Sequence, residues 1–296
     1  MAEDEPVPAV DPFSTGTTTL VGVLNTTPDS FSDGGRFVQG SDSGVDVAAA
    51  LVHAKQLEEN GADVLDIGGE STRPGAESVE LGLEIARTEP LIAALAEATQ
   101  LPISIDTRKA AVAEAALQAG AVIVNDVSGL CDEPGLAEVA ADHGAWLVVG
   151  HMRGSPETMQ KSPHFDDVIA EVGRELESSI DVAMRAGVQR ERIVGDPGIG
   201  FGKRLEDNLA LISCVAALRE KLGVPIMLGP SRKSFLGSLT GDPVDRREEA
   251  TLAACAVATF LGADALRVHD AYGARRAIRI GEALRSAQDA TLRGTA

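Results

Sequence analysis

Apolar and polar positions along the chain follow one repeating unit that covers most of the sequence. Each unit begins with a short apolar run rich in Val, Ile and Leu, which is typical of a buried strand. A longer stretch follows, in which apolar residues recur with the spacing of an amphipathic helix. The apolar runs lie at residues 18–25, 63–69, 102–107, 122–129, 146–152, 192–198, 225–231 and 265–270.

The stretches between these runs are rich in Ala and Leu, and Gly often follows them, as it commonly does at helix ends. We expect helices at residues 45–60, 80–99, 109–118, 135–143, 167–186, 205–222, 246–261 and 272–286. Strands that alternate with helices favour a parallel sheet with right-handed crossovers. Eight such units are the number that closes a barrel, so the sequence predicts a single TIM (β/α)8 barrel of the α/β class.

The chain of 296 residues is long enough for one such barrel, which needs about 250 residues. We assign residues 16–290 to the barrel, residues 1–15 to a flexible acidic tail and residues 291–296 to a C-terminal tail. An open, doubly wound sheet is the alternative architecture. The first expected helix does not begin with G-x-G-x-x-G, which disfavours that alternative.

Polar residues gather at the C-terminal ends of the apolar runs, where a parallel strand can bury them only if they are paired or in use. In a TIM barrel these strand ends form the catalytic mouth. Asp, Asn and Ser also serve as turn and cap residues, but a ring that includes Arg and His favours a functional site. Its members are Asn25, Asp66, Asp106, Asn125, Asp126, His151, Asp196, Ser231, Arg267 and His269.

Long connections follow the first, second, fifth and seventh runs, and such loops at a barrel mouth can close over a substrate. They span residues 26–35, 70–76, 153–165 and 231–237. The segment 198–203 resembles a P-loop. However, Pro197 stands where the first Gly belongs and Arg204 replaces the Ser or Thr, so a nucleotide triphosphatase is not predicted.

Eight segments resemble the dihydropteroate synthase family, in the family's order and one on each expected strand. They are LNTTPDSFSDGG (24–35), GADVLDIGGESTRPGA (61–76), ISIDTRKAAVA (103–113), VNDVSG (124–129), HMRGSP (151–156), DPGIGFGK (196–203), SRKSFLG (231–237) and RVHD (267–270). The resemblance covers about residues 18–285. Thr26, Gly150 and Pro230 depart from the family's pattern without removing a functional group.

This resemblance implies a transferase that acts in folate biosynthesis and is a target of sulfonamides. It joins 6-hydroxymethyl-7,8-dihydropterin pyrophosphate to p-aminobenzoate and releases 7,8-dihydropteroate and pyrophosphate. The implied path is SN1-like, because the dihydropterin can delocalise the positive charge left when pyrophosphate departs. The attacking amine is neutral near pH 7, so electrostatic stabilisation and positioning replace a strong general base.

The resemblance also implies the roles of individual residues. The pterin ring would contact Thr72, Asp106, Asn125, Asp196 and Lys233. Pyrophosphate would contact Arg267 and His269. The p-aminobenzoate pocket would contain Phe31, Pro74, Phe201 and Ser234, together with Lys233. Asp33, Arg73 and Lys233 would be catalytic, and Asn25 would contact a Mg²⁺ cofactor through its side-chain oxygen.

The chain has 26 Lys and Arg against 45 Asp and Glu, a net charge of −19. Such a surface disfavours nucleic acid and anionic membranes as partners, and leaves small molecules. Anionic substrates then require positive charge at the mouth. We expect this charge from Arg73, Lys203, Lys233, Arg267 and His269. We interpret Arg232 as structural.

The three cysteines show no C-x-x-C spacing, so neither a disulfide framework nor a zinc site is predicted. The first residues lack the pattern of a signal peptide, and no apolar run approaches the roughly 20 residues of a membrane helix. These features favour a cytoplasmic protein, and the resemblance implies a homodimer.

Two other functions stay open. One is a non-catalytic pterin-binding barrel, and the other is a corrinoid-dependent methyltransferase that acts on methyltetrahydrofolate.

Overall fold

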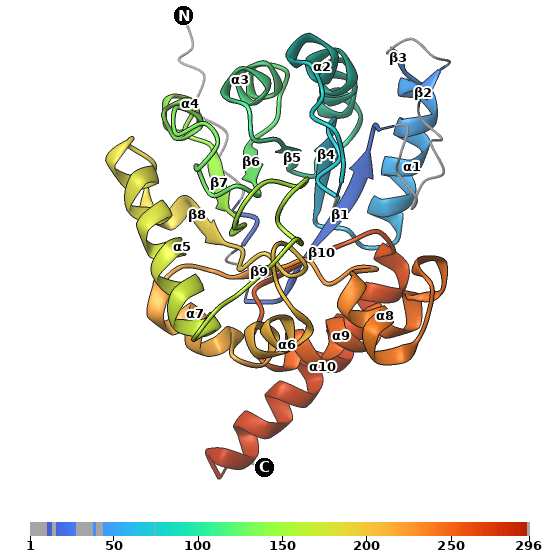
Figure 1. Ribbon diagram of the computed structural model, residues 1–296. Coiled ribbons are helices and arrows are strands. Elements are labelled where there is room, and N and C mark those ends of the chain that lie inside the picture. The colour runs from blue at the N-terminus through green and yellow to red at the C-terminus, as the bar shows by residue number, and fades with distance from the viewer. Residues whose placement is uncertain (1–10, 14–15, 28–37, 40–43, 74, 295–296) are drawn as a thin grey trace, which may run out of the picture.

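Eight parallel strands form the centre of the fold and follow one another around a barrel in chain order (Figure 1). The computed structural model describes residues 11–13, 16–27, 38–39, 44–73 and 75–294. The strands are β1 (Thr19–Asn25), β4 (Val64–Gly68), β5 (Ile103–Asp106), β6 (Ile123–Asp126), β7 (Trp146–Val149), β8 (Ile193–Gly195), β9 (Met227–Leu228) and β10 (Ala265–Val268).

The two ends of this sheet meet between β8 and β9. Gly195 and Ile226 form a parallel bridge there, and the Gly195 N–H donates to the Pro225 carbonyl over 2.9 Å. This pairing closes the sheet into a barrel. The predicted parallel TIM barrel is confirmed, and the open doubly wound sheet is excluded.

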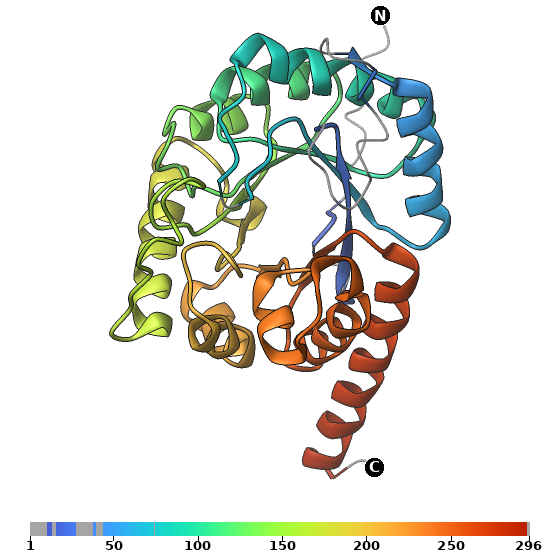
Figure 2. The ribbon, with the colours of Figure 1, turned by 45° about the vertical axis from the view of Figure 1, so that its right-hand side comes forward.

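Helices connect successive strands and surround them, as the ring of helices in Figure 2 shows. They are α1 (Val47–Glu59), α2 (Leu81–Ala98), α3 (Ala110–Gln118), α4 (Leu136–Asp142), α5 (Val168–Arg185), α6 (Leu205–Ser213), α7 (Val215–Leu222), α8 (Ser234–Thr240), α9 (Glu248–Phe260) and α10 (Ala271–Leu292). Short acidic side chains cap several of their starts; Asp46, for example, accepts the Ala49 N–H at the start of α1. No helix in the described part of the chain is long and apolar enough to cross a membrane.

The elements differ from the expected ones at several places. The expected helix 205–222 is two helices, because the chain leaves the helical conformation at Cys214 (φ −106°, ψ 19°). The seventh connection contains α8, and α10 continues to Leu292, into the range assigned to the C-terminal tail. Within the β1–α1 connection, β2 (Val38–Gln39) and β3 (Gly44–Val45) pair antiparallel.

The interior of the barrel changes from apolar to polar along the strands. Its lower layer is a buried apolar cluster that includes Val21, Val64, Ile123, Val148, Val194, Met227 and Ala265. Two residues further along four of these strands stand Asp66, Asn125, Asp196 and Arg267. Because strand side chains alternate between faces with a period of two, these polar residues form the next interior layer toward the mouth.

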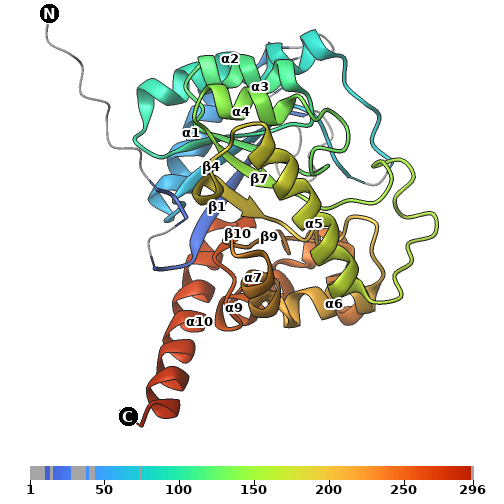
Figure 3. The same ribbon diagram turned by 90° about the vertical axis from the view of Figure 1, so that its left-hand side faces the viewer.

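Phe13 closes the floor of the barrel. Its side chain is buried, and its ring centroid lies 5.3 Å from that of Trp146 at the start of β7. The hydroxyl of Thr19 donates to the Pro12 carbonyl over 2.6 Å and ties this segment to β1. Figure 3 shows the start of β1 on one side of the barrel and the connections that precede α2 and α5 on the other. Phe13 therefore packs on the barrel, although it lies in the range assigned to the flexible tail.

We expect Phe13→Ala to lower the free energy of unfolding by about 3 kcal/mol, because it empties a buried aromatic site. Unfolding in urea, followed by circular dichroism, measures this change. The control is Leu292→Ala, whose side chain is 79% exposed and whose loss should cost less than about 0.5 kcal/mol. Equal effects of the two substitutions would show that Phe13 does not support the floor.

Candidate active site

An arginine inside the barrel binds two buried carboxylates. Arg267 on β10 donates from Nε to Asp66 Oδ2 and from Nη2 to Asp106 Oδ2, both over 2.6 Å. The Asn125 amide donates to the same oxygen of Asp66 over 3.3 Å. These four side chains come from β4, β5, β6 and β10, so one network links the polar layer across the interior.

Each of these aspartates also has an oxygen that the protein does not satisfy. Asp66 Oδ1 and Asp106 Oδ1 are buried, and no donor reaches them from the described part of the chain. An acceptor left in this way costs about 1–3 kcal/mol, so a ligand that brings N–H donors would gain by binding here. Burial raises the pKa of Asp106 to about 7, against the opposing effect of the positive charge of Arg267.

A cavity at the C-terminal ends of the strands borders this network. It is lined by Val23, Asn125, Val127, Asp196, Ile199, Phe201, Gly229, Ser231, Lys233, Arg267 and His269. Lys233 Nζ lies 3.7 Å from the centroid of the Phe201 ring, a cation–π distance. Burial lowers the pKa of Lys233 to about 8, and the charges of Arg267 and Arg73 act in the same direction.

Asp196 is fixed in the cavity wall by the turn that follows β8. Its Oδ1 accepts the Gly198 N–H over 2.7 Å, and burial raises the pKa of this carboxyl. Gly198 has φ 69°, and a Cβ at this position would lie 1.9 Å from the His151 carbonyl oxygen. Only glycine lets the turn approach the β7–α5 connection this closely.

A buried lysine and histidine lie under the same turn. Lys203 Nζ donates to His151 Nδ1 over 2.9 Å and to the Phe201 carbonyl over 3.0 Å. Because Nδ1 accepts, the neutral ring carries its proton on Nε2, which lies 2.9 Å from Glu175 Oε2. Burial lowers the pKa of His151 to about 4 and that of Lys203 to about 7.

The turn between β9 and α8 directs alternate side chains to opposite sides. Ser231 and Lys233 line the cavity, and Ser231 Oγ lies 2.8 Å from His269 Nδ1. Arg232, between them, adopts the left-handed conformation with φ 57°. Its Nε donates to Glu248 Oε2 on α9 over 3.0 Å. The interpretation of Arg232 as structural agrees with this contact.

The positive charge at the cavity comes from fewer groups than expected. Burial holds the pKa of His269 well below 6.5, so the ring is neutral near pH 7. Lys203 does not line the cavity. Lys233 and Arg267 remain, and Arg73 lies near enough for its charge to lower the pKa of Lys233. The expectation that His269 adds positive charge is therefore wrong.

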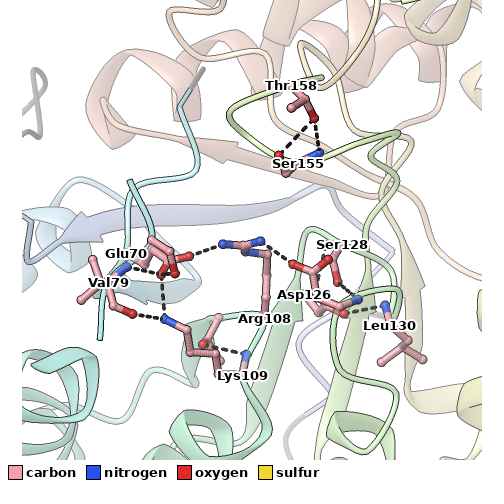
Figure 4. A network of polar contacts seen from close by, with 12 residues as sticks. Glu70, Val79, Arg108, Lys109, Asp126, Ser128, Leu130, Ser155 and Thr158 are labelled. Carbon is pink, nitrogen blue, oxygen red and sulfur yellow. Dashed lines mark hydrogen bonds and ion pairs between the residues drawn. The ribbon is translucent and has the colours of Figure 1, made fainter. Parts of the chain in front are cut away.

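Ionic contacts hold the base of the β4–α2 connection, which carries Thr72 and Arg73. Figure 4 shows the Glu70 carboxylate between Arg108 and Lys109, next to Val79. Glu70 is buried, and the hydrogen bonds of Lys109, Val79 and Arg108 lower its pKa in spite of burial. This network lies outside the barrel interior and was not expected.

Asn25 ends β1 beside Asp106. A methyl group on Gly68 would lie 3.2 Å from Asn25 Oδ1 and 3.7 Å from Asp106 Oδ2, so both oxygens face the same small space. The described residues contain no group of three or more His, Cys, Asp or Glu that could hold a metal. One amide oxygen with few protein ligands around it fits Mg²⁺, which keeps waters and takes substrate phosphates.

The structure brings most of the expected residues to one place. Six line the cavity, namely Asn125, Asp196, Phe201, Lys233, Arg267 and His269. Asp106 and Asn25 border it, Thr72 and Arg73 lie in the β4–α2 connection, and Ser234 begins α8 next to Lys233. The expected Phe31, Asp33 and Pro74 lie outside the described residues.

Sequence reasoning placed Asp66 in the polar ring but gave it no role. The sequence does indicate its position, because Asp66 follows Val64 by two residues and must lie on the same face of the strand. Glu70, Arg108 and Lys109 lie in two of the family segments, but the sequence predicts no contact between them. Nothing in their spacing indicates that they meet, since the contacts join two βα connections.

Comparisons with known proteins agree with this geometry. The family described as "Pterin binding enzyme" matches residues 21–269. A dihydropteroate synthase of Synechocystis sp. is 45% identical over 269 residues, which are 90% of each chain. The structure of Yersinia pestis dihydropteroate synthase with a sulfonamide drug complex has a TM-score of 0.86 and 39% identity, over 92% of this chain and 95% of that one. The structure of Xanthomonas albilineans dihydropteroate synthase with 4-aminobenzoic acid has a TM-score of 0.81 and 42% identity, over 91% and 94%.

A match of this extent, together with the site at the barrel mouth, identifies the family. The chain belongs to the dihydropteroate synthase family of pterin-binding enzymes.

Proposed function

We propose that the chain condenses 6-hydroxymethyl-7,8-dihydropterin pyrophosphate with p-aminobenzoate to give 7,8-dihydropteroate and pyrophosphate. The observation that carries this proposal is the buried Asp106 carboxylate, with one oxygen on Arg267 and the other without a protein donor among the described residues. The aminopyrimidinone edge of a pterin supplies N–H donors for such an oxygen. Asn125 and Asp196 add an amide and a second carboxylate to the same cavity wall.

Pterin recognition follows from the hydrogen-bonding capacity of these groups. Carboxylates accept from ring N–H groups, and the Asn125 amide can both donate and accept. Lys233 is a hydrogen-bond donor and complements these acceptors. Its side chain packs against the Phe201 ring. Thr72 would complete the pterin site from the β4–α2 connection.

Arg267 and His269 suit the pyrophosphate group. A guanidinium has five N–H donors, and the contacts with Asp66 and Asp106 use two of them. The other donors could meet phosphate oxygens while the carboxylate contacts persist. His269 is neutral, and its Nδ1 lies 2.8 Å from Ser231 Oγ. In the tautomer in which Nδ1 accepts from the Ser231 hydroxyl, Nε2 carries the ring proton and can donate it to an anion.

Catalysis would rest on electrostatics and positioning. As the bond to pyrophosphate breaks, positive charge develops on the dihydropterin, and the carboxylates of Asp106 and Asp196 stabilise it. Asp33 of the first connection would add to this effect, and Arg73 would stabilise the departing anion. The neutral amine of p-aminobenzoate then attacks the methylene carbon, without a strong base.

The arylamine pocket would lie beside Lys233. Phe201 and Ser234 are its described members, with Phe31 and Pro74 expected from the sequence. The relative from X. albilineans was solved with 4-aminobenzoic acid, which supports this substrate for the family. Sulfonamide binding by the Y. pestis relative supports inhibition of this chain by compounds that resemble the arylamine.

Mg²⁺ is proposed as the cofactor, with Asn25 as its protein ligand. Bound there, the ion would neutralise negative charge on the pyrophosphate group. Asn25 would hold it at the end of β1, close to Asp106. The remaining ligands would be water and substrate oxygens.

To test the function, we would measure formation of 7,8-dihydropteroate and pyrophosphate from the two substrates, with Mg²⁺ and with a chelator. We expect product only with Mg²⁺. Lys233→Met should lower kcat/KM about 100-fold, the scale for losing one electrostatic contact to the reacting groups. Lys55→Met, at a 73% exposed side chain, is the control.

A folded wild-type protein that binds pterin and makes no product would refute the synthase and favour the non-catalytic barrel. Methyl transfer from methyltetrahydrofolate to a corrinoid under the same conditions would favour the methyltransferase. Wild-type activity in both Lys233→Met and the control would show that Lys233 has no role in the reaction.

The pKa of Asp106 predicts how pterin affinity depends on pH. Only the ionised carboxylate accepts two N–H groups, and burial raises the pKa of Asp106 to about 7. Affinity should therefore weaken as the pH falls through 7, by about tenfold between pH 8 and pH 6. Calorimetric titration with 6-hydroxymethyl-7,8-dihydropterin measures it. If Asp106→Asn keeps the same pH dependence, the titrating group lies elsewhere.

We propose that two chains associate through α9 and α10 in the cytoplasm. The C-terminal half of α10 projects beyond the other helices (Figure 1). Val257, Tyr272, Ile280 and Leu284 on these helices are each more than half exposed, and apolar side chains of this kind favour an interface. The cytoplasmic location is supported by three cysteines that are all free.

The double substitution Ile280→Asp and Leu284→Asp should convert a dimer to a monomer, because it puts charges into a buried apolar contact. Light scattering coupled to size-exclusion chromatography gives the mass. Val52→Asp, at a 61% exposed position on α1, should leave the dimer intact. A monomeric wild type would contradict the proposed assembly.

A further inference from the structure

We propose, on the basis of the proposed function, that Glu70 and Lys109 are positioning residues for the β4–α2 loop. They fix the base of the loop that carries Thr72 and Arg73, and so control how these two side chains assist the reaction with the arylamine substrate. Neither side chain lines the cavity, and both act through the loop. Residues 70–79 are called the β4–α2 loop below.

One carboxylate joins the two ends of this loop. Glu70, at its start, accepts the Val79 N–H at its end over 2.8 Å, through Oε2. The Ser78 hydroxyl donates to the same oxygen over 3.4 Å. The Glu70 side chain therefore ties the start of the loop to its end.

Lys109, which lies outside the loop, binds both ends of its base. Its ammonium group donates to Glu70 Oε2 over 2.7 Å, to Glu84 Oε2 over 2.6 Å and to the Val79 carbonyl over 2.6 Å. An ammonium group has three donors, so each meets an acceptor. Arg108 binds the other oxygen of Glu70 (Figure 4). It also binds Asp132.

Lys109 lies in the same segment of the chain as Asp106, the expected pterin contact. Lys109 stands three residues after Asp106, and its N–H donates to Thr107 Oγ1 over 3.2 Å. The Thr107 hydroxyl in turn donates to Glu84 Oε1 over 2.7 Å. The base of the β4–α2 loop is thus fixed to the strand end that carries Asp106.

The tip of the loop has its own anchor. The Gly75 N–H donates to the Pro156 carbonyl of the β7–α5 connection over 3.1 Å. Arg73 lies between this tip and the base, and its carbonyl accepts the Ala76 N–H over 3.0 Å. Its charge lowers the pKa of both Lys233 and His269, which line the cavity.

The energetics favour a rigid base. Glu70 and Glu84 side chains are 5% and 1% exposed, and Lys109 is 17% exposed. Removing one partner of such a group leaves an unpaired buried charge, which is strongly destabilising. The base of the loop therefore keeps one arrangement, and less entropy is lost in ordering the loop when the second substrate binds.

The test is Lys109→Met, which keeps the length of the side chain and removes all three donors. We expect kcat/KM for p-aminobenzoate to fall about 100-fold, the scale for a misplacement of about 1 Å. The dissociation constant of 6-hydroxymethyl-7,8-dihydropterin should change less than about threefold, because Thr72 is the one expected pterin contact on this loop and Asp106, Asn125 and Asp196 are untouched. Amide exchange of residues 71–79 should become about tenfold faster.

Companion variants separate positioning from stability. Lys109→Arg restores the charge and should recover most of the arylamine kcat/KM. Arg108→Met removes only the second cation and gives a milder effect in the same direction, in case Lys109→Met does not fold. Lys55→Met, on the exposed face of α1, is the control and should match wild type in all three measurements.

Equal losses of pterin binding and arylamine use, with a lower melting temperature, would mean that Lys109 is merely structural and would overturn the proposal. Unchanged amide exchange in residues 71–79 would overturn it as well. If the wild type lacked synthase activity, the proposed function would fail by itself. Amide exchange would then still decide whether Glu70 and Lys109 fix the loop.

Discussion

Two carboxylates buried close together inside one barrel need a cation to balance their charge, and the rest of the site depends on the one that Arg267 supplies. The guanidinium reaches Asp66 on β4 and Asp106 on β5 from β10, which is separated from them by β1. Without it, burial and the charge of Asp66 would raise the pKa of Asp106 further and remove an acceptor that a pterin needs. With it, each carboxylate keeps one oxygen for the protein and one for a ligand.

The barrel interior gives this network its setting. Alternation along parallel strands puts an apolar layer directly below the polar one, and Phe13 and Trp146 close the floor. The polar layer can therefore meet solvent only at the mouth, where Lys233 and His269 stand. Low polarity below the network strengthens its electrostatic contacts, which suits a reaction that develops charge on the substrate.

The fold and the inner site could be predicted because both repeat along the chain. Eight apolar runs with polar ends place Asp106, Asn125 and Asp196 at one edge of a parallel barrel. What escaped prediction depends on contacts between distant connections. The pairing of Glu70 with Lys109 depends on how two connections meet in the folded protein, and the neutral state of His269 depends on its burial. The spacing of residues along the sequence indicates neither. The break at Cys214 shows the same limit, since a continuous helical pattern there hides a change of direction.

The left-handed residue at position 232 restricts which mutations the mouth can accept. Arg232 holds φ 57° so that Ser231 and Lys233 both reach the cavity. Side chains that branch at Cβ are strained in this conformation, and proline cannot adopt it. Sequence variation at position 232 is therefore confined to residues that tolerate the turn, such as Asn or Gly. A β-branched residue or proline at position 232 would instead force the turn to change and would move Lys233 in the cavity wall.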